Sequence, residues 1–278
     1  MKPVTVKRTV AIGDPAVAAD YLAQYSGLPK ARIKDAMNKG AVWLAKPGVA
    51  RRRLRRATAT LHPGDRLEFY YDEQLLAREP LPARCLADRR HYSVWLKPAG
   101  LMSQGNFYGD HCSLLRQAEQ HFQPARGAFL VHRLDREACG LMLVAHTRDA
   151  AVRLSRLFQE QRVHKEYRVE VRGRPGEAGA VGRIDVPLDG KPALTEYTVV
   201  SCDPDTDTSV LKVVIRTGRK HQIRRHLESV GHPVMGDPRY GSGNKNAEGL
   251  RLAAVLLRFR CPFTRREEVF RLEPAECS

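Results

Sequence analysis

The chain has 278 residues, of which 42% are hydrophobic, so it can form one large domain and a small one. Its 47 Lys and Arg residues exceed its 31 Asp and Glu residues and give a formal net charge of +16 at pH 7. This excess favours a polyanionic partner, either nucleic acid or an anionic membrane surface. A membrane-spanning protein is not expected, because no apolar run approaches the roughly 20 residues that a bilayer helix requires.

Cysteine usage and the start of the chain bear on the compartment. The first ten residues lack the apolar core of a signal peptide. No cysteines are spaced as C-x-x-C, which fits neither a zinc site nor a dense disulfide framework. We therefore expect a reduced, cytoplasmic protein. The six cysteines are Cys85, Cys112, Cys139, Cys202, Cys261 and Cys277.

Two short helices are predicted near the N-terminus. The first covers residues 16–25, with Asp14 as N-cap and Pro15 at the first helical position, and it ends at Gly27. The second covers residues 29–40. Its predicted inward face consists of Ile33, Ala36 and Met37. Its predicted exposed face carries Lys30, Arg32, Lys34 and Lys39.

A basic run, RRRLRR at residues 51–56, follows these helices. Such a run can be a solvated face, but five arginines interrupted only by Leu54 favour contact with nucleic acid. With the PGD turn at residues 63–65, the stretch from Val10 to Tyr71 resembles the RNA-binding domain named after ribosomal small-subunit protein S-four. That resemblance implies a set of RNA-binding residues. The set is Lys30, Arg32, Lys34, Lys39, Arg51, Arg52 and Arg53.

The sequence predicts a small N-terminal α/β RNA-binding domain over residues 1–75 and a larger domain over residues 89–278. Residues 76–88, which contain Pro80 and Pro82 and show little periodicity, are predicted to be a linker. In the larger domain, many strands with occasional helices and no regular strand–helix alternation indicate an α+β fold. Expected strands are 91–97, 163–173, 196–201, 209–216, 250–257 and 268–272. Expected helices are 113–122, 148–162 with Thr147 as its cap, and 220–231.

The most informative stretch runs from Leu130 to Ala145 and reads LVHRLDREACGLMLVA. Its two apolar runs predict buried strands joined by a tight polar connection. That connection places Asp135 at the edge of a rigid core, between Arg133 and Arg136. A fixed carboxylate kept ionised by nearby cations suits a nucleophile or a base. By itself the pattern also fits a solvated salt bridge.

Two later stretches add an aromatic residue and further cations. In the strand VHKEYRVEV the alternation points Tyr167 inward, which on pattern alone is typical of a core tyrosine. In the helix that follows Gly218, Arg224 borders the buried face and can turn inward. Three histidines cluster in this region, but their spacing does not match a metalloprotease helix, and we predict no metal site. They are His221, His226 and His232.

Three motifs together resemble the RluA-type pseudouridine synthases, which isomerise uridine in structured RNA. They are HRLDREACGLMLVA, VHKEYRVEV and TGRKHQIRRHLESVGHPVMGDPRYG, and KPAGL at residues 97–101 matches the family's lead-in loop. The resemblance extends from His91 to Leu272. It implies a pseudouridine-synthase catalytic fold, with a mixed, largely antiparallel sheet and flanking helices.

The resemblance also implies roles for individual residues. Asp135 matches the catalytic aspartate, and Arg224 matches the arginine that pairs with it. Tyr167 matches the tyrosine that stacks on the flipped uracil and is the favoured route for proton removal. Arg133 matches the arginine that reaches the RNA near the flipped site, and Leu252 matches an apolar residue against the base. Four more residues in the motifs are expected to bind substrate: His132, Arg219, His221 and Gln222.

The chemistry fits these residue types. Isomerisation breaks the bond from ribose to nitrogen 1 and rejoins the base through carbon 5, so nothing is oxidised and no cofactor or metal is expected. The carboxylate either attacks the ribose anomeric carbon or assists its deprotonation. Flipping the base costs a few kcal/mol, and aromatic stacking returns about 1–3 kcal/mol. The leading hypothesis is therefore a monomeric RNA pseudouridine synthase acting on ribosomal or transfer RNA.

Two other readings remain open. In the first, the chain is a non-catalytic RNA-binding or ribosome-assembly factor that kept the fold. Its support is that Ala138-Cys139 stands where the family has a pair of hydroxyl residues. In the second, the chain is a basic peripheral membrane protein, but it lacks a strongly amphipathic helix bearing Trp or Phe.

Overall fold

The computed structural model describes residues 3–273 and residue 276. They divide into two compact units. The first contains the residues up to Leu81 together with Gln104–Gln120, and the second contains Pro82–Ser103 with the residues from His121 onward. Residues 104–120, which the sequence analysis placed in the larger domain, thus group with the N-terminal unit. None of the described helices is long and apolar enough to cross a membrane.

The first unit is a four-stranded antiparallel sheet, in the order β1-β4-β2-β3, with two helices packed on it. Its elements are β1 (Val4–Thr9), α1 (Ala18–Ser26), α2 (Lys30–Asn38), β2 (Val42–Ala45), β3 (Arg52–Arg53), β4 (Arg66–Tyr71), α3 (Glu73–Leu76) and most of α4 (Leu114–His121). Alternation along β4 buries Leu67 and Phe69 against Tyr21 of α1 and Ile33 of α2.

The helix α1 starts two residues later than predicted, with Val17 as its N-cap. Asp14 does not cap it, because its carboxylate accepts hydrogen bonds from the backbone N–H of Ala11 (2.8 Å) and the hydroxyl of Tyr25 (2.5 Å). The predicted end at Gly27 is confirmed, since this residue is left-handed and donates its N–H to Ala23. The predicted inward face of α2 is confirmed as well, because Ile33, Ala36 and Met37 are fully buried.

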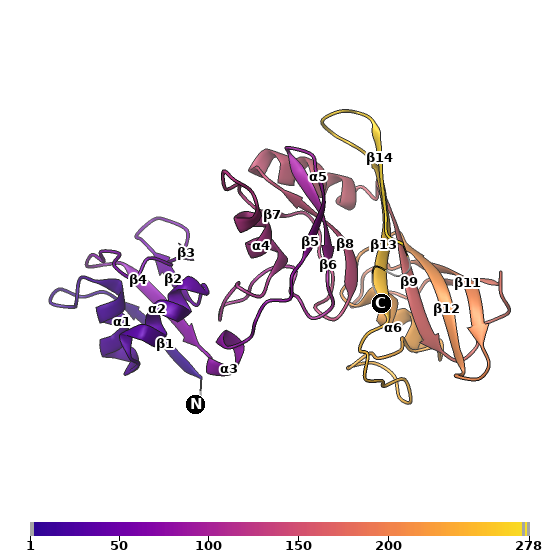
Figure 1. Ribbon diagram of the computed structural model, residues 1–278, viewed down its shortest axis with the longest axis horizontal. Coiled ribbons are helices and arrows are strands. Elements are labelled where there is room, and N and C mark those ends of the chain that lie inside the picture. Colours follow the sequence, from indigo (N-terminus) through magenta and orange to yellow (C-terminus); the bar gives the residue numbers. More distant parts are fainter. Residues whose placement is uncertain (1–2, 274–275, 277–278) are drawn as a thin grey trace. The chain divides into compact units, whose positions relative to one another are not determined.

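The second unit is built on one large sheet in the order β10-β11-β12-β9-β13-β8-β6-β5, with β14 added to β13 and β7 added to β8. Figure 1 shows these strands passing from β5 and β6 through β8 and β13 to β9, β12 and β11. The strands are β5 (Arg84–Asp88), β6 (Tyr92–Lys97), β7 (Phe129–Leu130), β8 (Cys139–Ala145), β9 (Val163–Arg172), β10 (Val181–Ile184), β11 (Thr195–Asp203), β12 (Thr208–Ile215), β13 (Leu252–Arg260) and β14 (Glu267–Arg271). The helices are α5 (Arg148–Gln159) and α6 (Gln222–Ser229).

The predicted fold class is confirmed. All strand pairs of the large sheet are antiparallel except β13 with β8, which run parallel. The strand β9 alternates between buried and more exposed residues along its whole length, as predicted. Two strands differ from expectation: residues 84–88, assigned to the linker, form β5 on β6, and β10 was not predicted. Among the described cysteines, Cys139 is disulfide-bonded, whereas Cys85, Cys112, Cys202 and Cys261 are free.

A close approach of two strands fixes the middle of this sheet. Ala253 and Ala254 of β13 pair with Cys139 and Gly140 of β8. Gly140 has φ +125°, and a Cβ at this position would overlap with the backbone O, N and Cα atoms of Ala254. Only glycine allows this contact. The connection that carries Asp135 leads directly into this fixed strand.

Candidate active site

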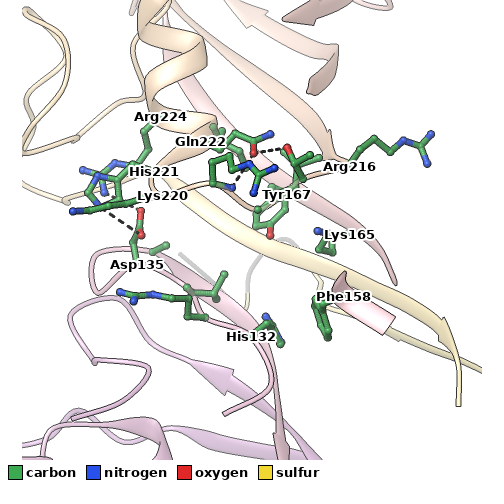
Figure 2. A pocket seen from close by; sticks show the side chains of 18 of the residues that line it. His132, Asp135, Phe158, Lys165, Tyr167, Arg216, Lys220, His221, Gln222 and Arg224 are labelled. Atoms are coloured by element: carbon green, nitrogen blue, oxygen red, sulfur yellow. Dashed lines mark hydrogen bonds and ion pairs between the residues drawn. The ribbon is translucent and has the colours of Figure 1, made fainter. Parts of the chain in front are cut away.

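A cavity of about 660 Å³ opens on the face of β9 that carries Lys165 and Tyr167. It lies between the end of α5 and the start of α6, and the connection between β7 and β8 forms another wall. Figure 2 shows Asp135 and His132 on that connection, facing Tyr167 and the residues that lead into α6. Three motifs far apart in the sequence therefore contribute to a single cavity.

Strand pairing and hydrogen bonds to neighbouring segments hold the β7–β8 connection in place. Leu130 pairs with Val144, so the strands predicted on either side of the connection do belong to one sheet. Leu143 donates its backbone N–H to Nε2 of His132 at 3.0 Å. On the other side, the hydroxyl of Ser103 donates to the carbonyl of Leu134 at 2.7 Å.

Lys97 of β6 is a further anchor, and it is fully buried. Its Nζ donates to three backbone carbonyls, those of Pro98 (2.9 Å), Leu101 (2.8 Å) and Arg136 (3.2 Å). Burial lowers the pKa of Lys97 to about 7, although the negative charges of Asp135 and Glu137 oppose this shift. The lysine thus ties the KPAGL loop to the turn that carries Asp135.

Arg224 is 2% exposed and holds two carboxylates. Its Nη1 donates to Oδ2 of Asp135 at 2.9 Å, while its Nε and Nη2 donate to the two oxygens of Asp237, both at 2.7 Å. Burial opposes the charged form, but these hydrogen bonds prevail and the pKa of Arg224 lies above its ordinary value. The predicted pairing of Arg224 with Asp135 is present in the structure.

Asp237 was missed by the sequence analysis, although its loop was part of a motif. It is 1% exposed, and its Oδ1 also accepts the backbone N–H groups of Arg239 (2.8 Å) and Tyr240 (3.1 Å). Burial alone would raise the pKa of Asp237, but these bonds and that of Arg224 lower it. The available signal was an aspartate before proline in a glycine-rich turn. That signal predicts a turn, but it does not predict that Asp237 pairs with the guanidinium of Arg224.

Tyr167 lies in the cavity together with Leu252, and both are nearly buried. Burial raises the pKa of Tyr167 above its ordinary value, and the nearby charge of Asp135 raises it further. The phenol is therefore neutral at physiological pH. Within the described residues its hydroxyl has no hydrogen-bond partner, so it faces the cavity rather than the core.

His132 lines the cavity and stacks on Phe158 of α5, with ring centroids 4.4 Å apart. Burial lowers the pKa of His132 to about 3, with a contribution from the charge of Lys165. The ring is neutral near pH 7, and its Nε2 is occupied by Leu143. We assign it to holding the connection, in addition to shaping the cavity wall.

The other predicted substrate-binding residues also lie at the cavity, but their side chains differ in whether they are free to bind a ligand. Gln222 is buried. Its side-chain oxygen accepts hydrogen bonds from Thr217 and Arg219, and its side-chain nitrogen donates hydrogen bonds to Leu194 and Thr195. It therefore positions the loop before α6 instead of offering free groups to a ligand. Arg133, by contrast, is exposed at the cavity.

His221 has φ 53° at the start of α6. Its Nδ1 bonds the hydroxyl of Tyr240 at 2.9 Å, and its Nε2 lies 3.6 Å from Oδ1 of Asp135. His226 instead bonds Thr195, and His232 bonds the carbonyl of Arg172. Among the described residues no group of three His, Cys, Asp or Glu side chains could hold a metal ion.

The cations predicted in the first unit fall into two groups. Lys30, Arg32, Lys34, Arg51 and Arg52 are exposed. Arg53 is half-buried, lies 3.0 Å from Asp110 and stacks over Trp43 at 4.2 Å. Its guanidinium is thus used within the unit, and so is the ammonium of half-buried Lys39, which lies 2.9 Å from Asp35. Within the exposed group, surface ion pairs join Lys30 to Asp20, Arg32 to Glu73 and Arg51 to Glu68. Such exposed pairs are weak enough to be exchanged for a phosphate contact.

The chain was compared with known families and proteins. The model of the family described as RNA pseudouridylate synthase matches residues 91–229, half of the chain. The ribosomal large subunit pseudouridine synthase D of Nitrosomonas europaea is 37% identical over 185 residues, which are 61% of this chain and 53% of that protein. This chain thus spans about half the length of that relative.

Two further relatives are covered more fully. An uncharacterized RNA pseudouridine synthase of Aquifex aeolicus is 32% identical over 245 residues, covering 80% of this chain and 75% of its own length. The dual-specificity RNA pseudouridine synthase RluA of Escherichia coli is 35% identical over 178 residues, covering 58% of this chain and 78% of its own.

Among solved structures, the human RNA pseudouridylate synthase domain containing 1 has a TM-score of 0.56 at 24% identity, covering 69% of this chain and 84% of that one. The human RNA pseudouridylate synthase domain containing 4 has a TM-score of 0.54 at 22% identity, covering 68% and 87%. At this identity the likeness concerns the fold.

Proposed function

The chain belongs to the RNA pseudouridylate synthase family, and from this premise we propose that it isomerises uridine to pseudouridine in structured RNA, with Asp135 as the reactive carboxylate. One observation carries the assignment of Asp135. A carboxylate, a guanidinium and a phenol from three separate motifs meet in one cavity. Asp135 and Tyr167 are then the residues that act on the ribose and the base, and Arg224 positions Asp135.

Arg224 fixes both the charge and the orientation of Asp135. Because Asp237 holds two of its nitrogens, the guanidinium has little freedom to turn, and its Nη1 is left for Oδ2 of Asp135. The other carboxylate oxygen, Oδ1, is 3.6 Å from His221, beyond good hydrogen-bond distance. Oδ1 is therefore the oxygen that reacts with the ribose of a bound uridine.

Tyr167 supplies the stacking surface for the flipped uracil. Base–aromatic stacking is worth about 1–3 kcal/mol per base, comparable to the few kcal/mol needed to flip it. Its raised pKa makes the phenol a poor proton acceptor in the free enzyme. If Asp135 forms an ester with the ribose, its charge is lost, and one cause of that raised pKa disappears before the proton must leave carbon 5.

The remaining energy for base flipping comes from phosphate contacts. Arg133, Arg216 and Lys220 line the cavity and are exposed, so they can bind the backbone on either side of the target. The exposed cations of the first unit add to this attraction. We assign that unit to RNA binding, as its resemblance to the S-four domain predicts.

A non-catalytic RNA-binding factor is not favoured. The relatives are named as synthases, and the chain keeps the carboxylate, guanidinium and phenol in one cavity. Ala138, where the family has a hydroxyl residue, is 1% exposed and lies beside the cavity. Its methyl group adds to the apolar wall and leaves the three reactive groups in place.

The relatives' names suggest where to look for the substrate. One is named for the ribosomal large subunit and another for dual specificity, so ribosomal RNA and transfer RNA are the two classes to test. Both should be offered as transcripts without modifications and labelled with tritium at carbon 5 of uridine. Isomerisation releases that tritium to water, because carbon 5 becomes bonded to the ribose.

The wild-type protein should release tritium from at least one class, and the modified uridine is located by carbodiimide-blocked reverse transcription. Asp135→Asn should bind the same RNA with unchanged affinity and release nothing above background. Equal modification by both proteins would contradict the role of Asp135. Binding without modification by either protein would favour a binding factor.

A further inference from the structure

Lys165 is a buried cation that the roles proposed above do not use. It is 8% exposed and lies two residues before Tyr167 on the same face of β9, lining the cavity. Burial lowers the pKa of Lys165 below its ordinary value. Within the described part of the chain its ammonium has no carboxylate partner and no hydrogen bond.

Lys97, a buried lysine of the same unit, differs from Lys165 in its hydrogen bonding. Lys97 is fully buried, and its ammonium donates hydrogen bonds to three backbone carbonyls. An ammonium that is largely buried without such partners is costly, since little water reaches it and no carboxylate compensates its charge. A protein that keeps such a group beside a cavity has left its charge available to a ligand.

The surroundings of Lys165 make this charge effective. Its Nζ lies 6.0 Å from the ring centroid of Phe158, which in turn stacks on the neutral His132. Leu252 closes the same cavity, and Figure 2 shows Lys165 between Tyr167 and the His132–Phe158 pair. In this part of the cavity wall the neighbours of the ammonium are apolar or neutral, so its charge acts on a ligand with reduced screening.

We propose that the ammonium of Lys165 stabilises the negative charge that develops on the uracil ring when the ribose–base bond breaks. This inference rests on the proposed function. When carbon 1′ separates from nitrogen 1, the bonding electron pair leaves with the base, which becomes an anion delocalised over N1, O2 and O4. This holds whether Asp135 bonds to carbon 1′ or takes the proton from carbon 2′.

Once the base has turned, the C5=C6 electron pair of the anion forms the new bond to carbon 1′, and the charge on N1 forms a double bond to carbon 6. On the ester route the bond from Asp135 to carbon 1′ breaks and its electrons return to the carboxylate; on the other route Asp135 returns its proton to carbon 2′. The proton on carbon 5 is then lost, N1 gains a proton, and Lys165 ends the cycle in its starting state. No proton needs to pass through the lysine. It acts by charge alone, as donors in an oxyanion hole do.

A phosphate is a less suitable partner for this lysine. The exposed cations Arg133, Arg216 and Lys220 already stand where a backbone can remain partly hydrated. A phosphate brought to Lys165 would lose its water in an apolar pocket at high cost. The ring that stacks on Tyr167, two residues away on β9, reaches the ammonium without that cost.

The test is Lys165→Met, which keeps an unbranched side chain of nearly the same length and removes its charge. In single-turnover reactions with tritiated RNA, the rate should fall by about 10²–10³-fold, as for the loss of one oxyanion-hole donor. RNA affinity and its salt dependence should remain those of the wild type. The melting temperature should stay the same or rise, because an unpaired buried charge is removed.

Three outcomes would overturn the inference. The first is an unchanged rate. The second is weaker binding with a salt slope reduced by about 0.7–0.9, which would mark a phosphate contact. The third is a lower melting temperature, which would mark a structural partner for the ammonium. Lys97→Met is the matched control and should lower the melting temperature, because it leaves three buried carbonyls unpaired.

Failure of this inference is distinguishable from failure of the proposed function. If the wild type releases tritium and Lys165→Met does so equally well, only the role of Lys165 is refuted. If the wild type releases none from either RNA class, the proposed function itself fails.

Discussion

At the scale of single residues, the site depends on a guanidinium shared by two carboxylates with different tasks. Asp237 is 1% exposed and takes two nitrogens of Arg224, whereas the side chain of Asp135 is 22% exposed and takes one. The more buried partner thus orients the arginine, and the more exposed one is available for reaction. Arg224 and Asp237 act as positioning residues in this arrangement.

The variant Asp237→Asn tests whether Asp237 orients Arg224. Removing one charge from a buried pair leaves the other uncompensated and typically costs about 3–5 kcal/mol. We therefore expect a loss of that size in the free energy of unfolding, measured by urea denaturation. The reaction rate should fall as well, because Arg224 no longer holds Asp135 in place.

Asp189→Asn is the control for Asp237→Asn. Asp189 also accepts two bonds from an arginine of α6, Arg225, but its side chain is 69% exposed. Exposed pairs contribute little to stability, because water and salt screen them, so Asp189→Asn should leave the free energy of unfolding nearly unchanged. Similar losses in both variants would show that the burial of Asp237 does not matter.

His132 gives the fold a predictable response to acid. Its pKa falls from an ordinary 6.5 to about 3 in the folded state. Between these values the unfolded chain binds a proton that the folded protein does not, so the free energy of unfolding decreases as the pH falls. Each pKa unit corresponds to about 1.4 kcal/mol, which predicts a contribution of about 2 kcal/mol between pH 7 and pH 5.

Urea denaturation of the wild type and His132→Leu at both pH values checks this. The variant lacks the titrating ring, so its stability should depend on pH less steeply than that of the wild type. The sign is fixed by the direction of the shift. Parallel pH dependences in the two proteins would contradict a lowered pKa of the half-buried His132 in the folded state.

At the scale of elements, the parallel contact between β8 and β13 sets the position of the catalytic turn. Gly140→Ala places a Cβ against the backbone of Ala254 at a φ of +125°. Overpacking costs about 1–3 kcal/mol, and the unfavourable φ adds about 1–2 kcal/mol. We expect a loss of about 3 kcal/mol in stability and a lower reaction rate, because β8 can no longer hold the turn at Asp135.

Gly218→Ala serves as the control for stability. A Cβ at position 218 meets no atom within 4 Å. Its free energy of unfolding, measured in the same urea titration, should remain within about 1 kcal/mol of the wild type. If Gly140→Ala is as stable as Gly218→Ala, the close approach of the two strands does not constrain the sheet.

The elements also show what the sequence could reveal. The strand at residues 163–172 was predictable because alternation with period two is a local pattern. The cap of α5 was equally readable, since Thr147 accepts the N–H of Ala150 as an N-cap should. The motifs brought Asp135, Tyr167 and Arg224 to attention together because each has a recognisable local setting.

Other features depend on contacts between distant segments. The carboxylate of Asp237 meets Arg224 only because the loop after α6 folds back onto the helix. No local sequence pattern predicts this path of the loop. The unpaired state of Lys165 is likewise a property of the packed cavity. Even Asp14 was misread, because its capping pattern was locally correct and a more distant partner, Tyr25, took its carboxylate.

At the scale of the whole molecule, a net charge of +16 gives a general attraction to RNA, but individual cations contribute differently. In the run at residues 51–56, Arg53 and Arg55 both bind Asp110, at 3.0 and 2.5 Å. Arg52 and Arg56 are exposed. Arg51 is exposed too, but it forms an ion pair with Glu68 at 3.1 Å. Arg52 and Arg56 are therefore the arginines of this run that can most readily exchange their hydration for phosphate contacts.

The double variant Arg52→Ala/Arg56→Ala should therefore weaken RNA binding at low salt without changing stability. Each phosphate contact contributes about 0.7–0.9 to the slope of log affinity against log salt concentration, so the slope should become shallower by about 1.5. Arg53→Ala/Arg55→Ala should instead lower the melting temperature, because both side chains hold Asp110 within the unit. An unchanged salt slope in the first variant would show that this face of the N-terminal unit does not meet RNA. The attraction would then have to come from the exposed lysines of α2 or from the cations around the cavity.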